Sequence, residues 1–248
     1  MTVLSLVLAA PLQAWGSESR FTTRASDDAP TKSGVLGLLA AAKGLRRTDP
    51  LEELTHLRFG VRLDQPGKHL RDFQTARSLD GRKTMPLSQR YYLADGRYAV
   101  GLEADRELLE GVAEALLNPV YPLYLGRRSC PPSQPLVPRL HESSLEGFLL
   151  TEPWHAATWW KRRRSSVTEG LRFRIDAEGT TGELDPYLTG ESTRRDVPVS
   201  FDPEHRQYGW RTVQHGIIPV PLERRDDKQT DGPDTDTALT HEPLAALE

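Results

Sequence analysis

The order of apolar patterns in the first half of the chain constrains the fold more than any other feature. In chain order, the patterns predict a strand, a helix, a strand, a strand region that contains a turn and is counted once, a helix and a strand, at residues 2–10, 31–47, 56–64, 90–103, 105–117 and 120–125. This is the βαββαβ order of the ferredoxin-like fold, in which two helices back one antiparallel sheet. We therefore expect an α+β protein whose residues 1–130 form such a domain. RNA-recognition modules share this fold, but fold alone does not give function.

The amino-acid composition of the sequence changes after residue 126. Residues 129–138 (SCPPSQPLVP) are rich in proline and mark a boundary. Beyond it, a smaller β-rich unit is expected over residues 140–222, with strand-like runs at 146–151, 171–175, 197–201 and 208–218. Residues 223–248 hold eight acidic and three basic side chains and few apolar ones, so we expect an acidic, flexible tail.

The net charge of −3 hides an uneven distribution of charge. Because three of the 32 Lys and Arg and eight of the 35 Asp and Glu lie in the tail, residues 1–222 hold 29 basic and 27 acidic side chains. Residues 58–97 hold nine basic and four acidic side chains, and residues 127–164 hold seven and three. Two positive regions on a nearly neutral body indicate a polyanionic partner. Solvated surface faces would give the same counts.

No catalytic or metal-binding motif stands out. The single cysteine, Cys130, excludes a disulfide framework and an all-cysteine zinc site, and no two histidines lie four residues apart. The sequence PTKSG at residues 30–34 lacks the spaced earlier glycine of a phosphate loop. The first apolar run is too short for a membrane span and has no basic start like that of a signal peptide. We expect a cytoplasmic protein with no catalytic residue, metal, cofactor or membrane contact.

Basic and aromatic residues supply better candidates for function. A set able to stack a base and hold phosphates lies in one loop and comprises Trp15, Arg20, Phe21 and Arg24. The helix that follows begins at Thr31, where unpaired amides and the helix dipole favour an anion and Lys32 would add charge. A simple N-cap role would also explain Thr31.

Two further stretches combine arginine with glycine or tryptophan. Gly126 would let a polyanion approach the backbone, and Arg127 and Arg128 are able to bind phosphate with both guanidinium nitrogens. An aromatic and basic stretch follows later, with Trp154, Trp159, Trp160 and residues 161–164 (KRRR). Core packing of the tryptophans and a solvated basic turn would explain this second stretch equally well.

Several longer motifs together resemble one protein family. The motifs are PLQAWG at residues 11–16, PTKSGVLGLLAAA at 30–42, HLRFGVRLDQPGKHLRDFQTA at 56–76 and YLGRRSCP at 124–131. They occur in the order seen in the Cas-five family, within the superfamily of repeat-associated mysterious proteins, and they are similar to the CasD subunits of type I-E CRISPR Cascade complexes. The resemblance spans roughly residues 3–136 and is looser beyond residue 140.

The resemblance implies a non-catalytic subunit of an antiviral surveillance complex. Members of the family grip the 5′ handle of the CRISPR RNA, cap the filament of Cascade backbone subunits and contact the large subunit, while target DNA is reached mainly through the complex. Residues 65–89 would be the family's thumb, a β-hairpin, and the segment around Gly126 its glycine-rich loop.

The residues expected to bind RNA combine these family positions with the basic and aromatic candidates. They are Gln13, Trp15, Arg20, Arg24, Thr31, Lys32, Ser33, Gly34, Arg58, Arg71, Gln74, Arg77, Arg82, Lys83, Arg90, Gly126, Arg127 and Arg128. The thumb residues expected to contact a partner subunit are Phe73, Met85 and Leu87.

Two alternative functions stay open at this point. The weaker one is a pure protein adaptor, whose binding to its partners would be insensitive to RNA. Relatives from another subtype cut repeat RNA with a tyrosine, a lysine and a histidine. The residue types are present here in His56, Lys68, His69, Tyr91 and Tyr92. A metal-independent endoribonuclease is therefore the second hypothesis. It ranks below the scaffold because the spacing of these residues matches no motif of the cleaving subtype.

Overall fold

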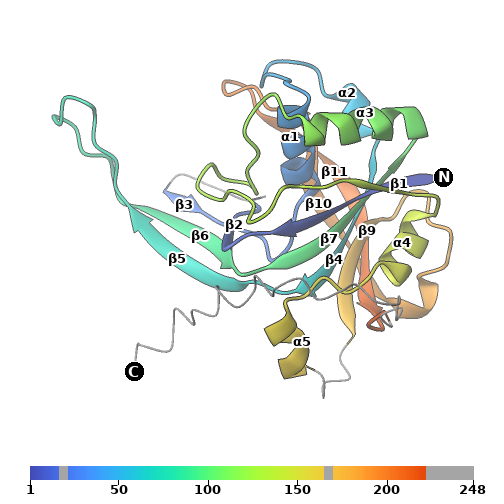
Figure 1. The fold of residues 1–248 in the computed structure, drawn as a ribbon. Coiled ribbons are helices and arrows are strands. Elements are labelled where there is room, and N and C mark those ends of the chain that lie inside the picture. The colour runs from blue at the N-terminus through green and yellow to red at the C-terminus, as the bar shows by residue number, and fades with distance from the viewer. Residues whose placement is uncertain (17–21, 165–169, 222–248) are drawn as a thin grey trace.

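The computed structural model describes residues 1–16, 22–164 and 170–221. Within these residues the chain is an α+β protein with a large and a small β-sheet, and helices cover both faces of the large sheet (Figure 1). The large sheet consists of β1 Thr2–Ala9, β4 Arg58–Gln65, β7 Arg97–Ala104, β8 Arg139–His141, β9 Leu171–Asp176, β10 Leu188–Ser200 and β11 Gln207–Ile218. The small sheet consists of β2 Leu12–Gln13, β3 Thr23–Arg24, β5 Lys68–Gln74 and β6 Ser88–Ala94.

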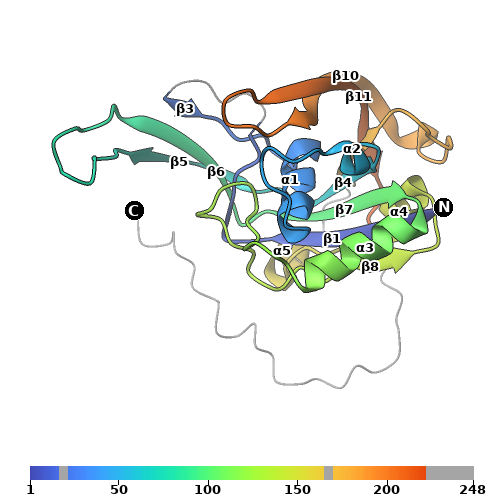
Figure 2. The same ribbon diagram turned by 90° about the horizontal axis from the view of Figure 1, so that it is seen from above.

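The helices divide between the two faces of the large sheet. They are α1 Lys32–Ala42, α2 Glu52–Thr55, α3 Arg106–Leu117, α4 Leu145–Thr151, α5 Thr158–Arg164 and the 3₁₀ turn η1 Asp185–Tyr187. Figure 1 shows α1, α2 and α3 on one face and α4 and α5 on the other. Seen from above, α1 lies between α3 and the β10–β11 hairpin (Figure 2).

The strand order of the large sheet is β10-β11-β9-β4-β7-β1-β8, and every neighbouring pair is antiparallel. The predictions of strands at residues 2–10, 56–64, 171–175 and 208–218 are confirmed by β1, β4, β9 and β11. Residues 90–103 form two strands as expected, but β6 joins the small sheet and β7 the large one. Since β9 pairs with β4, the strands after residue 170 extend the sheet built by the first half of the chain. The division near residues 130–140 stays a prediction, which independent folding of the two parts would test.

Side chains of the central strands alternate between two hydrophobic cores. On β7, Tyr98 and Val100 pack in the core that lies under α1 and α3, whereas Ala99 faces the core under α4. This alternation follows from the two-residue period of a strand, and it requires the apolar residues that the sequence places on both faces. The large sheet therefore has a packed hydrophobic layer on each side.

Two predicted strands are wrong. Residues 120–125 form no strand; β8, at Arg139–His141, pairs with β1 instead. Pro119 and Pro122 explain this, because proline has no N–H to donate to a strand ladder. Residues 146–151 lie in α4, where the Ser144 hydroxyl accepts a hydrogen bond from the amide of Gly147 at 3.0 Å and caps the helix.

Residues 65–89 contain the hairpin that extends from the body (Figure 1). Strands β5 and β6 pair from Lys68 with Ala94 to Gln74 with Ser88, and an isolated bridge joins Arg77 to Thr84 farther out. The side chains beyond Gln74 are mostly exposed. The acidic tail, residues 223–248, lies outside the described residues. No helix in the described ranges is long and apolar enough to cross a membrane.

Candidate nucleic-acid interface

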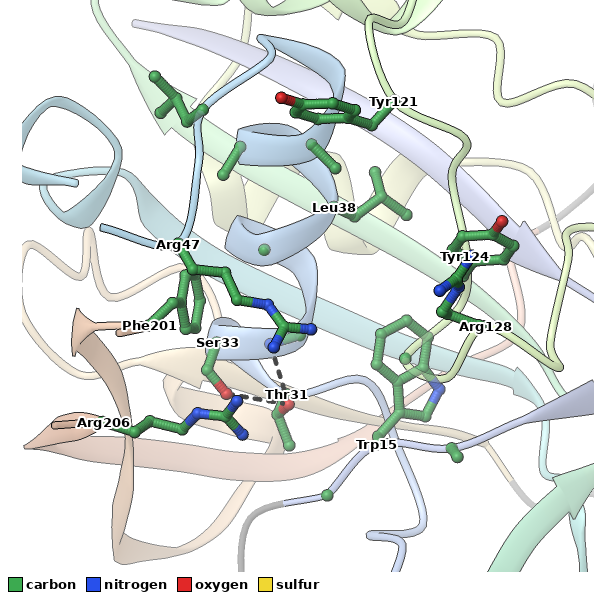
Figure 3. A pocket seen from close by; sticks show the side chains of 18 of the residues that line it. Trp15, Thr31, Ser33, Leu38, Arg47, Tyr121, Tyr124, Arg128, Phe201 and Arg206 are labelled. Carbon is green, nitrogen blue, oxygen red and sulfur yellow. Dashed lines mark hydrogen bonds between the residues drawn. The ribbon is translucent and has the colours of Figure 1, made fainter. Parts of the chain in front are cut away.

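A groove of about 690 Å³ runs along the outer side of α1 (Figure 3). The loop at residues 121–128 forms one wall, and the β10–β11 turn forms the other. Figure 3 shows Arg47, Phe201 and Arg206 on one side of α1, and Tyr124 and Arg128 on the other. Segments from the first, middle and last thirds of the chain therefore meet at this groove.

The lining of the groove is basic and aromatic. It includes Arg46, Arg47, Arg128 and Arg206 and contains no Asp or Glu. All four arginines are exposed, and among the described residues only Arg46 has a carboxylate within 4.0 Å, that of Asp49. The aromatic lining residues are Trp15, Tyr121, Tyr124, Phe201 and Tyr208. Guanidinium groups bind phosphate well and aromatic rings stack on bases, so this lining suits a nucleic acid.

Glycine shapes the floor of the groove at Gly34. A Cβ at this position would lie 2.7 Å from Cε3 of Trp15, closer than real contacts allow. The indole therefore packs directly on the first turn of α1. Trp15 is fully buried, and its Nε1 donates to Oε1 of Gln13 at 3.0 Å, while Nε2 of Gln13 donates to the carbonyl of Gly96 at 2.7 Å. Trp15 and Gln13 thus support the groove from within, which differs from the expected base-stacking role of Trp15.

The helix start is already occupied by the chain's own carboxylates. The Lys32 amide donates to Asp196 at 2.9 Å, and the Lys32 ammonium pairs with Asp176 at 2.9 Å with both side chains buried. The Thr31 hydroxyl accepts from the amide of Gly34 at 3.2 Å, so its predicted capping role is confirmed. Thr31, Ser33 and Gly34 line the groove. A phosphate contact by Lys32 stays a prediction that would require the ion pair with Asp176 to open.

A buried ionic cluster holds the β10–β11 wall against α1. Arg211 on β11 donates to both oxygens of Asp196, at 2.6 and 2.9 Å, and also contacts Asp176. Burial raises the pKa of Asp196, but hydrogen bonds and charge from Arg211 outweigh burial, so the pKa lies below its ordinary value. Asp196 therefore carries its charge in the folded chain and links α1, β10 and β11.

The two arginines of the glycine-rich loop have different positions. The half-buried Arg127 donates to the carbonyls of Tyr91 at 2.9 Å and of Arg24 at 2.7 Å, and its guanidinium lies 4.7 Å from the centre of the Tyr92 ring. It joins the loop to β3 and β6. Arg128 is exposed and lines the groove. Arg127 therefore holds the loop against β3 and β6, whereas the exposed Arg128 is able to contact a ligand in the groove.

The remaining predicted residues lie in three places. Arg58 pairs with Glu103 and Glu146 at the opposite end of the sheet from the hairpin, so it is not brought to the groove. On the hairpin, exposed positions are Arg71, Phe73, Gln74, Arg77, Arg82, Lys83, Met85 and Leu87, and Arg90 is half-buried on β6. Arg24 is exposed on β3, beside β6. Arg20 and Phe21 lie outside the described residues.

Sequence reasoning missed most of the groove lining. It named none of Arg46, Arg47, Tyr121, Tyr124, Phe201, Arg206 and Tyr208. The Arg46-Arg47 pair at the end of the predicted helix was a usable signal. Arg206 and Phe201 had none, because only the pairing of β11 with β9 brings their hairpin to α1.

The candidates for catalysis do not form one constellation. His56 follows α2, whereas Lys68 and His69 lie on β5 and Tyr91 and Tyr92 on β6. Among described residues, no hydrogen bond joins any of these five to another; Tyr92 lies 3.4 Å from the hydroxyl of Ser129. Burial raises the pKa of the Cys130 thiol despite the neighbouring charge of Arg127. In the described ranges, no group of three His, Cys, Asp or Glu is placed to hold a metal ion.

Comparisons with known proteins identify the family. The family model of the CRISPR-associated protein (Cas_Cas5) matches residues 3–214. The CRISPR system Cascade subunit CasD of Escherichia coli (strain K12) is 37% identical in an alignment of 154 residues that covers 54% of this chain and 68% of that protein. A solved Cas protein is 33% identical with a TM-score of 0.65, covering 88% of this chain and 97% of the other. A chain of a CRISPR RNA-guided surveillance complex is 28% identical with a TM-score of 0.69, covering 89% and 91%. The resemblance seen in the sequence motifs is thereby confirmed, and the chain belongs to the CRISPR-associated Cas_Cas5 family.

Proposed function

We propose that this chain is a non-catalytic, RNA-binding subunit of a type I-E Cascade complex, and that its groove holds the 5′ handle of the CRISPR RNA. The observation that carries the proposal is the groove itself, with four arginines, several aromatic rings and no carboxylate in its lining. Arginines and aromatic rings both suit a single-stranded RNA, because guanidinium groups bind its phosphates and aromatic rings stack on its unpaired bases. The relatives, a Cascade subunit and a chain of an RNA-guided surveillance complex, support the same role.

The strand order supports a ferredoxin-like core as the RNA-binding platform. Strands β8, β1, β7 and β4 are neighbours in this order and antiparallel, while α1 follows β1 and α3 follows β7. With β1, β4, β7 and β8 as the four strands of the βαββαβ unit, this is the 4-1-3-2 order of that fold. The groove then lies on the face of the sheet that α1 and α3 cover, next to α1.

We place the RNA along a path from the groove to the hairpin. Arg128 stands at the groove, while Arg127 joins the same loop to β6, which continues into the thumb. Arg71, Arg77, Arg82 and Lys83 on the hairpin would follow the phosphates. Phe73, Met85 and Leu87 would contact a backbone subunit, and the large subunit would bind elsewhere on the chain. Target DNA would be reached through the assembled complex, in the cytoplasm.

Copurification tests this function directly. The full chain is expressed with the other Cascade subunits and a repeat–spacer array, the complex is isolated through a tag on this chain, and the bound RNA is sequenced. We expect RNAs that share one repeat-derived 5′ end. Assembly without RNA, or RNA of random sequence, would contradict the proposal.

The endoribonuclease alternative has a separate test. Purified full-length chain is incubated with end-labelled repeat RNA in EDTA, and a His69→Ala variant serves as the comparison. Intact RNA is expected throughout. Site-specific cleavage that disappears in the variant would replace the scaffold role by the enzyme.

A further inference from the structure

The helix α5, with the sequence TWWKRRR, lies on the face of the large sheet opposite α1 and the groove (Figure 1). Its position is fixed by hydrogen bonds to the end of β4. The Ala157 amide donates to Oε1 of Gln65 at 3.0 Å, and the Trp154 indole donates to the carbonyl of Asp64 at 2.8 Å. Because β4 continues from this point into the thumb hairpin, α5 is held at the base of the thumb.

The aromatic residues of α5 leave one indole open to solvent. Trp159 is 50% exposed, although tryptophan is usually well covered. It is supported by Trp160, which meets it edge to face with the ring centres 5.5 Å apart. Trp160 is half-buried, whereas the surface of Trp159 remains available for stacking.

The basic residues of α5 differ in exposure. Lys161 lies 5.5 Å from the centre of the Trp154 ring, and Arg164 lies 5.1 Å from that of Trp160. Arg162 and Arg163 are exposed, and α5 contains no acidic residue. The helix thus presents two guanidinium groups beside one exposed indole on a fixed support.

We infer that α5 is a second nucleic-acid site, which binds a single-stranded polynucleotide by stacking a base on Trp159 and pairing phosphates with Arg162 and Arg163. An exposed aromatic face can stack on an unpaired base, whereas the bases of a duplex are already stacked on each other. The positive charge beside the indole favours a polyanion over an apolar partner. The site lies on the opposite face from the groove, so its ligand is a strand other than the handle segment held there.

The test measures binding of a labelled 30-nucleotide single-stranded DNA of mixed sequence to the purified full-length chain at several salt concentrations. One variant, W159A, removes the stacking surface, and a second, R162A/R163A, removes two charges. The control, R106A/R139A, removes two exposed arginines from α3 and β8. Melting temperatures are compared first, and all three variants should stay folded because the altered side chains are exposed.

The two α5 variants should weaken binding in different ways. W159A should lose about five- to a hundredfold in affinity with an unchanged salt slope, since stacking carries no counterion release. R162A/R163A should flatten the slope by about 1.4, which corresponds to two single-strand phosphate contacts. The control should keep the affinity and slope of the wild type.

Wild-type affinity and slope in both α5 variants would overturn the proposal. The same result is expected if α5 is covered by the acidic residues 223–248 or reserved for an acidic protein partner. An equal loss in the control variant would also overturn it, because the effect would then be one of net charge alone. Binding of repeat RNA in the groove is measured in parallel, so failure here is separate from failure of the proposed function.

Discussion

A side-chain carbon on Gly126 would overlap the carbonyl oxygen of Ala14. The loop is held in this place by the Ala14 amide, which donates to the carbonyl of Leu125 at 3.1 Å, and Gly126 itself has a φ of +92°. Two independent restrictions therefore require glycine here, one of space and one of backbone conformation. The wall of the groove depends on this contact between residues more than a hundred positions apart.

Gly126→Ala should consequently destabilise the chain and weaken RNA binding together. The overlap and the positive φ should lower the free energy of unfolding by roughly 1–3 kcal/mol or more, measured by urea denaturation. Gly111→Ala is the matched control, because a Cβ at exposed Gly111 on α3 would meet nothing within 4 Å. It should stabilise the helix by about 0.5–1 kcal/mol. Equal effects of the two changes would contradict the close contact at Gly126.

Substitution of Arg127 should lower the stability of the chain, whereas substitution of Arg128 should weaken RNA binding. Arg127→Ala removes hydrogen bonds from a charged group to the carbonyls of Tyr91 and Arg24, so it should cost about 1.5–3 kcal/mol of unfolding free energy. Arg128→Ala changes an exposed side chain and should alter stability by no more than about 0.5 kcal/mol. It should instead flatten the salt slope of RNA binding by about 0.7, one single-strand phosphate contact. Unchanged RNA binding by a folded Arg128→Ala protein would remove Arg128 from the interface.

The Asp196 cluster should make stability depend on pH in the acid range. The folded pKa of Asp196 is lowered, since the hydrogen bonds and charge of Arg211 outweigh the effect of burial. Its stabilising contribution is therefore complete above the unfolded pKa of about 3.9, and it is lost as the pH falls through the lower folded value. Asp196→Asn breaks a buried ion pair and should cost roughly 3–5 kcal/mol at pH 7.

Urea denaturation at pH 7, 5, 4 and 3 measures this effect. The difference in unfolding free energy between wild type and Asp196→Asn should be constant from pH 7 to pH 5 and should shrink at pH 4 and below. Glu114→Gln, which changes an exposed carboxylate on α3, should differ little from wild type throughout. A constant difference down to pH 3 would mean that the Asp196 carboxylate does not supply the stabilisation.

Local sequence patterns were enough to predict the helix that forms the floor of the groove. The apolar spacing of α1 and its cap at Thr31 follow from neighbouring residues, and the structure has both. The approach of a polyanion to Gly126 stays a prediction; in the structure the missing side chain makes room for the carbonyl of Ala14. Proline was the neglected local signal, since Pro119 and Pro122 should have excluded a strand at residues 120–125.

The composition of the groove could not be predicted, because burial and pairing depend on distant residues. Lys32 pairs with the carboxylate of Asp176, which lies 144 positions later in the chain, so the sequence cannot distinguish a buried ion pair from a phosphate ligand. Trp15 has the residue type of a stacking platform, but its Nε1–H is bonded to Gln13 inside the core. Arg206 reaches the groove only because β11 joins the sheet next to β9.

The tip of the thumb should be needed for assembly and not for folding of the body. Residues 75–87 pack little against the rest of the chain, and the exposed apolar side chains there include Leu79, Met85 and Leu87. Gln74 and Ser88 are opposite each other on β5 and β6, so an Asn-Gly turn can replace the tip and close the hairpin. This shortened chain should unfold at nearly the same urea concentration as wild type, because little apolar surface is lost from either core.

Coexpression with the other Cascade subunits should then show a loss of stable complex. A second variant, L79S/M85S/L87S, keeps the length and the charges of the tip and removes only its apolar side chains, so it separates contact with a protein partner from contact with RNA. If those side chains contact a backbone subunit, this variant should lose assembly while the isolated chain still binds repeat RNA through the groove. Trypsin gives an independent measurement, since Arg77, Arg82 and Lys83 are exposed in the free chain and should be protected in the complex. Full assembly by the shortened chain, or equal cleavage of free and assembled protein, would leave the thumb as a dispensable surface hairpin.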